Sequence, residues 1–196
     1  MNEAEPTERS VPTAIVFALP KHGAEPLDSV AGLPLVLRTV LTLQKIGVER
    51  LVVVTGAASC DAVVSACADP RVKATLTFVT AATEQDGEQA AVPTLGATYI
   101  RSRHHVIAHP AAYKALLTAP PGGHDLDTES FWTVDVCSIE GRREAVHELF
   151  EACRKSVDGL VSRHLNRHVS IFTSKLIVET SITPNAISVM NFFLGI

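Results

Sequence analysis

Short apolar runs alternate with longer amphipathic segments through the first part of the chain. The runs at 13–20, 50–56 and 72–80 are rich in apolar and β-branched residues, which is typical of strands buried in a parallel sheet. Residues 34–47 and 57–68, which lie between these runs, have the pattern of helices. Strands and helices that alternate with short links predict right-handed crossovers and a parallel sheet covered on both faces.

The rest of the chain has a less regular pattern. The expected elements are a polar loop or helix start at EQDGEQ, a strand within 96–109 of open bounds, a helix at 110–119, a surface loop at 119–130, a strand at 131–138 and a helix at 139–155. Residues 13–155 are therefore predicted to form one α/β domain, a three-layer sandwich with a mostly parallel sheet. A disordered polar leader is expected at residues 1–12.

The composition is that of a folded protein without general affinity for nucleic acids. Of the 196 residues, 46% are apolar and 19% are charged, which is a globular composition. The formal net charge is -4 and the pI is near 6.0, so the surface as a whole does not attract a polyanion. The four cysteines form no CxxC pair, which indicates reduced thiols in a cytosolic setting.

A sheet of this kind binds its ligands beyond the carboxyl ends of the strands. The loops 20–33 and 56–60, the neighbourhood of 103–109, and Asp135 all fall at that edge in the predicted fold. These positions are therefore the first candidates for a functional site.

The stretch 13–56 resembles the start of the nucleotidyltransferases that make sugar, inositol or alcohol nucleotides. That family has an apolar strand, a glycine-rich loop, a K-P-L segment and then V-x-G-x-P-L before a helix. The matching residues are Pro26, Leu27, Val30, Gly32, Pro34 and Leu35. The stretch 131–145, FWTVDVCSIEGRREA, resembles the family's W-x-D-V-D-T-x-E-D-L, and the resemblance covers about residues 13–155.

This resemblance implies nucleotide and metal ligands for the domain. It implies CTP and an alcohol phosphate as substrates, with Mg²⁺ as the cofactor of an active enzyme. The residues it marks are Lys21, His22, Gly23 and Gly32 for nucleotide binding, Lys21, Arg38 and Asp135 for catalysis, and Asp135 for the metal.

The sequence departs from the family pattern at positions that bind phosphate or metal in that family. They are Leu19 and Pro20 in the glycine-rich loop, Glu25 at the lysine before Pro-Leu, Arg103 and His104 at a G-D pair that holds metal, and Cys137 at a second aspartate. Proline removes an N–H donor, glutamate reverses a charge, and imidazole is a poor ligand for Mg²⁺. Because three elements are altered together, the pattern favours a domain that has lost or changed its catalysis.

A transition-metal site is a weaker alternative. His104, His105 and His109 with Cys137 offer imidazole and thiolate, which suit zinc. Their spacing matches no zinc signature, and adjacent histidines on a strand point to opposite faces. Surface histidines, or histidines with satisfied hydrogen bonds, are the favoured interpretation.

Residues 158–196 resemble the start of the CDP-alcohol phosphatidyltransferases, above all the bifunctional proteins in which a cytidylyltransferase domain precedes the membrane enzyme. The matching residues are Asp158, Gly159, Val161, Ser162, Arg163, Leu165, Asn166, Arg167, Ser170, Thr180 and Ile182 to Asn185. Residues 156–196 are then expected to be a juxtamembrane amphipathic helix and the truncated start of a transmembrane helix. The family's acidic motif, D-x-x-D-G-x-x-A-R, does not occur in the chain.

The basic residues of this segment suit a membrane surface. Arg163, Arg167 and Lys175 accompany the apolar residues of 160–178 and can meet anionic headgroups, although a solvated helix face has the same pattern. The resemblance implies a cytosolic domain attached to the membrane.

Three functions follow from these observations. The first is an altered nucleotidyltransferase-like domain attached to a phosphatidyltransferase, which can still bind CTP or a CDP-alcohol. The second is an active cytidylyltransferase that joins CTP to an alcohol phosphate and depends on positioning and cations. The third is a scaffold or homodimerisation module without a ligand.

Overall fold

The computed structural model describes residues 12–126 and 131–152. The chain divides into two compact units, which are residues 1–29 with 33–145 and residues 30–32 with 146–196. The fold below is that of the first unit. Outside the described residues lie almost all of the predicted leader and the predicted membrane segment with Arg163, Arg167 and Lys175.

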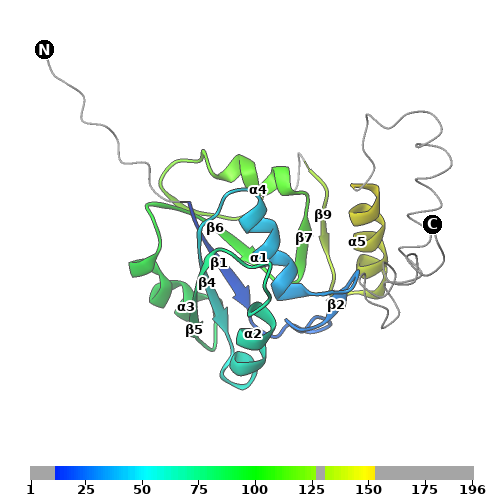
Figure 1. Cartoon of the computed structure of the whole chain (residues 1–196), viewed down its shortest axis with the longest axis horizontal. Helices are drawn as coiled ribbons and strands as arrows, with labels where there is room; N and C mark the ends of the chain where they lie inside the picture. Colours follow the sequence, from blue (N-terminus) through cyan, green and yellow to red (C-terminus); the bar gives the residue numbers. More distant parts are fainter. Residues whose placement is uncertain (1–11, 127–130, 153–196) are drawn as a thin grey trace, which may run out of the picture. The chain divides into compact units, whose positions relative to one another are not determined.

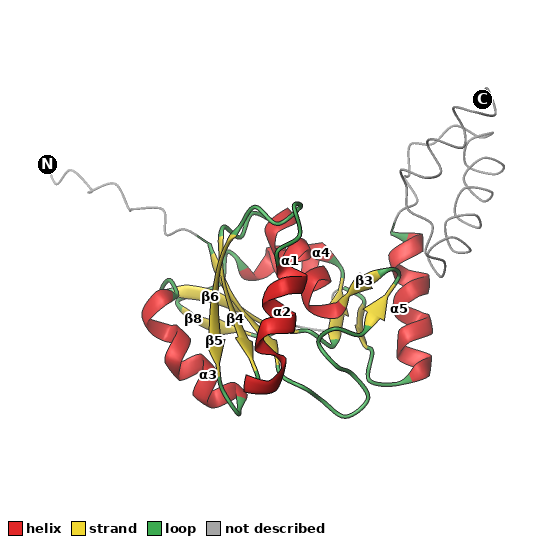
Figure 2. Cartoon of the chain, turned by 60° about the horizontal axis from the view of Figure 1, so that its bottom comes forward, coloured by secondary structure: helices red, strands yellow, loops and turns green. Residues whose placement is uncertain are grey.

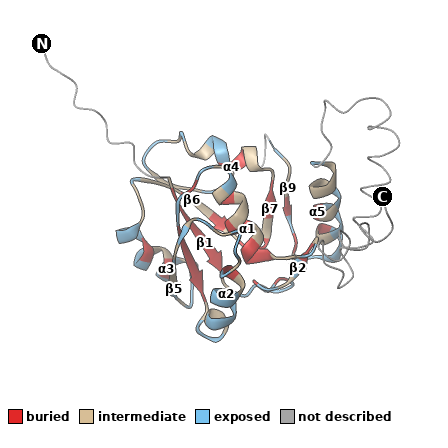
Figure 3. Cartoon of the chain, viewed as in Figure 1, coloured by how far each residue is buried: buried red, intermediate tan, exposed pale blue. Residues whose placement is uncertain are grey.

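A five-stranded parallel sheet forms the centre of this unit (Figure 1). Its order is β5-β4-β1-β6-β8, and every pair of neighbours is parallel. The strands are β1 Thr13–Ala18, β4 Arg50–Thr55, β5 Thr75–Thr80, β6 Thr98–Arg103 and β8 Gly122–His124. All six residues of β1 are buried, because the strand is in the middle of the sheet (Figure 3). The three strands predicted in the first part of the chain are confirmed, with shorter bounds.

Helices cover both faces of the sheet. The covering helices are α1 Leu35–Lys45, α2 Cys60–Cys67, α3 Glu84–Ala91 and α4 Pro110–Leu116, with the 3₁₀ turns η1 Ala57–Ser59 and η2 Val92–Thr94. A further helix, α5 Ile139–Glu151, follows β9 in the chain and is not part of these layers. Successive β1 side chains face opposite layers: Val16 packs in the core below α1, α2 and α4, and Phe17 packs with Ala91 of α3. Figure 2 shows α1 and α2 on one side of the sheet and α3 on the other. The predicted three-layer α/β sandwich is confirmed.

A second, antiparallel sheet follows β6 and shapes the strand-end region. It pairs β7 Val106–Ala108 with β9 Thr133–Asp135, so that Val106 lies opposite Asp135. The predicted strand within 96–109 is therefore two strands, β6 and β7, and the predicted strand at 131–138 shortens to three residues. The remaining short strands are β2 Ser29–Val30 and β3 Leu33–Pro34.

The predicted surface loop at 119–130 contains the edge strand β8. Its glycines have low strand propensity, so no strand is predicted there from the residue pattern. The strand pairs with β6, and Gly123 leaves room for the Tyr99 ring, because an added Cβ would come within 2.7 Å of that ring. The Tyr99 hydroxyl donates to Glu88 Oε1 of α3 at 2.6 Å, which fixes the ring.

No helix among the described residues has the length and apolar character needed to cross a bilayer. The predicted transmembrane start lies beyond those residues.

The packing of α3 on the sheet predicts the effect of one methyl group. A Cβ at Gly87 would overlap the Cγ1 atom of fully buried Val54. Gly87→Ala gains about 1 kcal/mol of helix propensity but overpacks the core by about 1–3 kcal/mol. We expect a net loss of about 1 kcal/mol in the free energy of unfolding, measured in urea by circular dichroism. Gln89→Ala, on the exposed side of α3, is the matched control. A Gly87→Ala protein as stable as the control would contradict this packing.

Candidate functional site

The carboxyl ends of β1, β4 and β5 open into a pocket of about 340 Å³. Its walls are backbone and small or apolar side chains, without a charged group. The lining residues are Leu19, Pro20, Gly56, Ala57, Thr80, Ala81 and Ala82. A pocket lined in this way offers a ligand mainly apolar contact area and no charged side chain. The loops predicted at 20–33 and 56–60 both contribute to it.

The loop after β1 closes on itself. Lys21 and Ala24 exchange two backbone hydrogen bonds of 3.1 and 2.9 Å around a tight turn, with Gly23 at a φ of +86°. The next turn is closed by the Glu25 N–H, which donates to Asp28 Oδ2 at 3.0 Å, and by the Asp28 N–H, which donates to the Glu25 carbonyl. Several N–H groups that a glycine-rich loop would direct at phosphates are therefore used within this loop.

His104 holds this loop against the end of β1. Its side chain is 1% exposed, with Nδ1 3.1 Å from the Phe17 carbonyl oxygen and Nε2 3.2 Å from the Ala24 carbonyl oxygen. The His104 backbone N–H also donates to the Phe17 carbonyl. One buried side chain thus joins the end of the central strand to the turn that follows it.

Arg142, in the first half of α5, holds the same loop from the other side. Its Nη2 donates to the Gly23 carbonyl at 2.8 Å and to Asp28 Oδ2 at 2.6 Å, and its Nε donates to the Val136 carbonyl at 3.1 Å. The Glu25 N–H and the Arg142 guanidinium outweigh partial burial and hold the pKa of Asp28 below its usual value. The loop is therefore anchored by the β6–β7 turn, through His104, and by α5, through Arg142.

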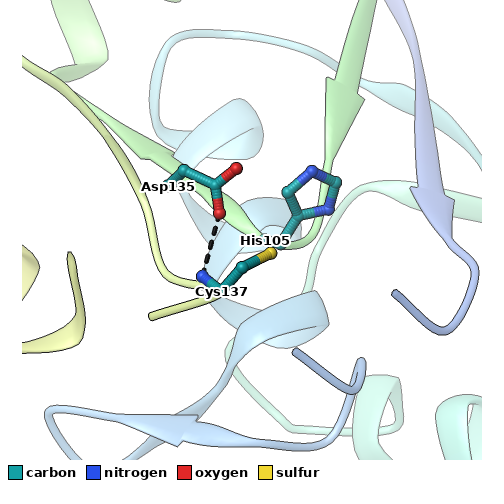
Figure 4. Close-up of side chains that lie close together, drawn as sticks. All are labelled: His105, Asp135 and Cys137. Carbon is teal, nitrogen blue, oxygen red and sulfur yellow. Dashed lines mark hydrogen bonds between the residues drawn. The ribbon is translucent and has the colours of Figure 1, made fainter. Parts of the chain in front are cut away.

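Four polar side chains converge beside the loop. Lys21 Nζ lies 2.8 Å from His105 Nε2 and 3.5 Å from Asp135 Oδ2. Asp135 Oδ1 accepts the Cys137 backbone N–H at 2.9 Å. One ligand atom each from His105, Asp135 and Cys137 lies within 4.8 Å of the other two (Figure 4). The β7–β9 pairing creates this cluster, because it sets the turn that holds His105 against the end of β9.

The protonation states of the cluster follow from burial and charge. Burial, then the positive charge of Lys21, lowers the pKa of His105 to about 4, so its imidazole is neutral at pH 7. Burial opposes ionisation of Asp135, but the hydrogen bonds from Cys137 and the Lys21 charge outweigh it and lower the Asp135 pKa. Burial and the Asp135 carboxylate raise the pKa of the Cys137 thiol. The cluster thus holds one imidazole lone pair, one carboxylate and one thiol.

These groups do not fit the Mg²⁺ that the family resemblance implies. Mg²⁺ requires near-octahedral oxygen ligands at about 2.0–2.1 Å. Asp135 supplies the carboxylate of the cluster, one of its oxygens accepts the Cys137 N–H, and the other faces the Lys21 ammonium. A neutral nitrogen and a sulfur complete the set, and both are poor ligands for a hard cation.

The cluster includes two of the residues predicted from sequence. Lys21 and Asp135 come together, whereas Arg38 lies within α1, where burial lowers its pKa to about 10. His22 is exposed at the turn next to Gly23. Gly32 follows β2 with a φ of +75°, which favours glycine.

From the sequence, His105 is a candidate only within the disfavoured zinc set of His104, His109 and Cys137, and not as a neighbour of Asp135. The alignment put Arg103 and His104 at the metal-binding pair, but Arg103 pairs with Glu84 and Asp125, and His104 anchors the loop. The two histidines lie in the β6–β7 turn, so the expectation based on alternating faces of a strand does not apply to them. Only the pairing of β7 with β9, residues about 30 apart in sequence, identifies His105 as the partner of Asp135.

Comparison with known proteins supports a nucleotidyltransferase-like fold. No protein-family model matches the chain. The chain is 46% identical over 66 residues to the bifunctional IPC transferase and DIPP synthase of Thermococcus kodakarensis, a match that covers 33% of this chain and 15% of that protein. The match thus spans only a small part of that relative's length.

Two solved structures resemble the fold. HddC from Yersinia pseudotuberculosis has a TM-score of 0.53 and 10% identity, and covers 70% of this chain and 99% of its own. A UDP-glucose pyrophosphorylase complexed with UDP-glucose has a TM-score of 0.50 and 9% identity, and covers 72% and 99%. At these identities the likeness concerns the fold alone, and it confirms the nucleotidyltransferase-like architecture predicted from the sequence.

The Arg142 contacts predict a role in holding the loop. Arg142→Lys keeps the charge but loses the planar fork that contacts the Gly23 and Val136 carbonyls together. Because the ion pair with Asp28 is partly exposed, we expect a loss of only about 1 kcal/mol in unfolding free energy. Amide hydrogen exchange at residues 21–28 should become faster by a larger factor than the loss in unfolding free energy alone would produce. Arg143→Lys, at the exposed neighbouring position, is the control. Unchanged exchange in the loop would show that Arg142 does not anchor it.

Proposed function

We propose that the domain binds a cytidine nucleotide at its strand ends but has lost nucleotidyl transfer, and that it is the cytosolic part of a longer CDP-alcohol phosphatidyltransferase. The observation that carries the proposal is the contrast between the pocket and the loop beside it. The pocket keeps the space for a base, whereas the phosphate side has its donors and its cation engaged within the protein.

The pocket supports nucleotide binding. Small residues at the ends of three parallel strands leave about 340 Å³ beside the first loop. Ligands of doubly wound sheets bind at this edge, and a pyrimidine ring is flat and has polar edges that backbone groups can contact. Cytosine is the base that the family resemblance of the sequence implies.

The loop and cluster support the loss of transfer. In-line nucleotidyl transfer depends on holding the phosphates and on cations that stabilise the charge developing on them. Lys21 can reach a phosphate only by leaving His105 and Asp135, and Pro20 has no N–H to donate. The nitrogen and sulfur donors of His105 and Cys137 also suit Mg²⁺ poorly. What remains to these residues is to orient a bound nucleotide through Lys21 and the Gly23 turn.

The attachment to a membrane enzyme rests on sequence. The 158–185 motif resembles the start of a CDP-alcohol phosphatidyltransferase, and the bifunctional IPC transferase shares 46% identity over 66 residues. In the proposed arrangement the domain delivers or senses a CTP-derived substrate, and Arg163, Arg167 and Lys175 contact anionic headgroups.

Nucleotide titration tests the proposed binding without transfer. We expect isothermal titration of the 196-residue chain with CTP to release heat, with and without Mg²⁺, and no pyrophosphate to form when an alcohol phosphate such as inositol 1-phosphate is added. Gly56→Leu should weaken CTP binding about ten-fold or more. At a φ of -72°, Gly56 tolerates a side chain, whose Cβ makes ordinary contacts with Pro20 and Ser59 at the pocket wall. Ala90→Leu, on the exposed side of α3, is the matched control.

The other outcomes are distinct. Pyrophosphate release would overturn the loss of transfer and identify an active cytidylyltransferase. If CTP produced no heat, the domain would be a scaffold, and the nucleotide proposal would be wrong. If Ala90→Leu weakened CTP binding as much as Gly56→Leu does, the loss of binding would not be due to the pocket.

Vesicle binding tests the membrane proposal. We expect the full chain to sediment with vesicles that contain phosphatidylserine more strongly than with phosphatidylcholine vesicles, because each basic residue near an anionic surface contributes about 1 kcal/mol. The triple variant Arg163→Gln, Arg167→Gln and Lys175→Gln should lose most of this preference. The control replaces three exposed lysines of the described domain, Lys45, Lys73 and Lys114, by Gln. Equal losses in the two triple variants would reduce the effect to net charge and contradict a dedicated membrane segment.

A further inference from the structure

His104 and His105 are adjacent, buried and differently bonded. They are 1% and 4% exposed, with ring centroids 5.2 Å apart. Both ring nitrogens of His104 face backbone carbonyls, as expected for a histidine with a structural role. His105 Nδ1 is buried and makes no hydrogen bond to any described residue, while Nε2 faces Lys21. A buried polar atom without a partner is costly, so His105 needs a reason other than packing.

Lys21 marks a cation position within the cluster. An ammonium only donates, so His105 Nε2 accepts its hydrogen bond and carries the lone pair. The same ammonium lies 3.5 Å from Asp135 Oδ2. The Lys21 ammonium is therefore held by His105 and Asp135, the two side chains that could ligate a metal at the same point. The Lys21 side chain is 49% exposed and can move into solvent.

The donor set matches a borderline divalent cation. Imidazole nitrogen, carboxylate oxygen and thiolate sulfur are the ligands of Zn²⁺, and three protein ligands leave a fourth position open. Tetrahedral ligands at about 2.0–2.3 Å lie roughly 3.3–3.8 Å from one another. The three ligand atoms here lie within 4.8 Å. Because Cys137 is only partly buried, a change of side-chain torsion can supply the remaining approach of roughly 1 Å.

We propose that His105, Asp135 and Cys137 form a binding site for a borderline transition cation, of which Zn²⁺ and Co²⁺ are probes, and that Lys21 is its competing internal cation. Binding breaks the contacts of Lys21 with His105 and Asp135 and moves its ammonium into solvent. Cys137 Sγ loses its proton to solvent as the metal–sulfur bond forms, and no electron is transferred. The proposal holds whether or not the domain binds CTP.

The site differs from dedicated zinc sites in one respect. The second nitrogen of a zinc-bound histidine usually donates to a carboxylate or carbonyl, and loss of such a partner weakens binding about 10–100-fold. His105 Nδ1 has no such acceptor among the described residues. This site is therefore expected to bind metal reversibly and to exchange it with solvent, rather than to hold a permanent structural ion.

Cobalt titration of the full chain tests the site. Cys153 lies outside the described residues, so every protein carries Cys153→Ser. We expect Co²⁺ to produce a thiolate-to-cobalt charge-transfer band in the near ultraviolet, which Zn²⁺ abolishes and excess Mg²⁺ does not. Cys137→Ser should remove the band, and His105→Gln and Asp135→Asn should each weaken binding about ten-fold or more. Lys21→Met should tighten it roughly five-fold, because it removes a competing and repelling charge.

Matched controls separate this site from other thiols and imidazoles. Cys60→Ser and His124→Gln, at partly exposed positions outside the cluster, should leave the band unchanged. Absence of the band in the parent protein, or its persistence after Cys137→Ser, would overturn the proposal. Competition by Mg²⁺ at equal concentration would overturn the assigned metal class, and weaker binding in Lys21→Met would overturn the role of Lys21. If buried His105→Gln fails to fold, the partly exposed Cys137 still decides the question.

Discussion

The bridge that His104 makes between the Phe17 and Ala24 carbonyls sets the geometry of the strand-end site. Phe17 belongs to the central, fully buried strand, so its position is fixed by hydrogen bonds to β4 and β6 and by packing on both faces. Ala24 closes the turn that presents Lys21. The His104 imidazole thus ties the loop to the rigid sheet. Without it, the conformation of the loop would depend on the loop's own turns. Arg142 then fixes the far side of the same loop.

A loop held in this way has little freedom to rearrange around phosphates. Its charged groups are balanced within the protein: Asp28 against Arg142, and Lys21 against Asp135. Both pairs are partly exposed, so each contributes little to global stability, but each sets where a charge points. The departures seen in the sequence, Pro20 and Glu25, are consistent with this arrangement, because a loop closed on itself needs fewer N–H donors and no second cation.

The sequence predicted the parts of the fold that depend on local pattern. The apolar pattern of each of β1, β4, β5 and α1 extends over only a few consecutive residues. The burial of these elements could therefore be predicted from the sequence. The strand β8 could not be predicted, because Gly122 and Gly123 have low strand propensity and their pairing with β6 is a long-range contact. Lys21 and Asp135 were found through a family resemblance. His105 was considered only for a zinc site with His104, His109 and Cys137, and its proximity to Asp135 was not predicted because it depends on a long-range strand pairing.

The same long-range pairing explains why the cluster has mixed donors. The turn after β6 makes two contacts. His104 anchors the first loop, and His105, the next residue, faces the end of β9. His105 places a nitrogen donor beside Asp135 where a hard cation would prefer an oxygen donor, so the set no longer suits such a cation. Cys137 adds sulfur to that set. The Lys21 ammonium contacts the imidazole and the carboxylate of this set, so a cation that binds there competes with an internal charge, and nitrogen and sulfur ligands favour a borderline metal over Mg²⁺ in that competition.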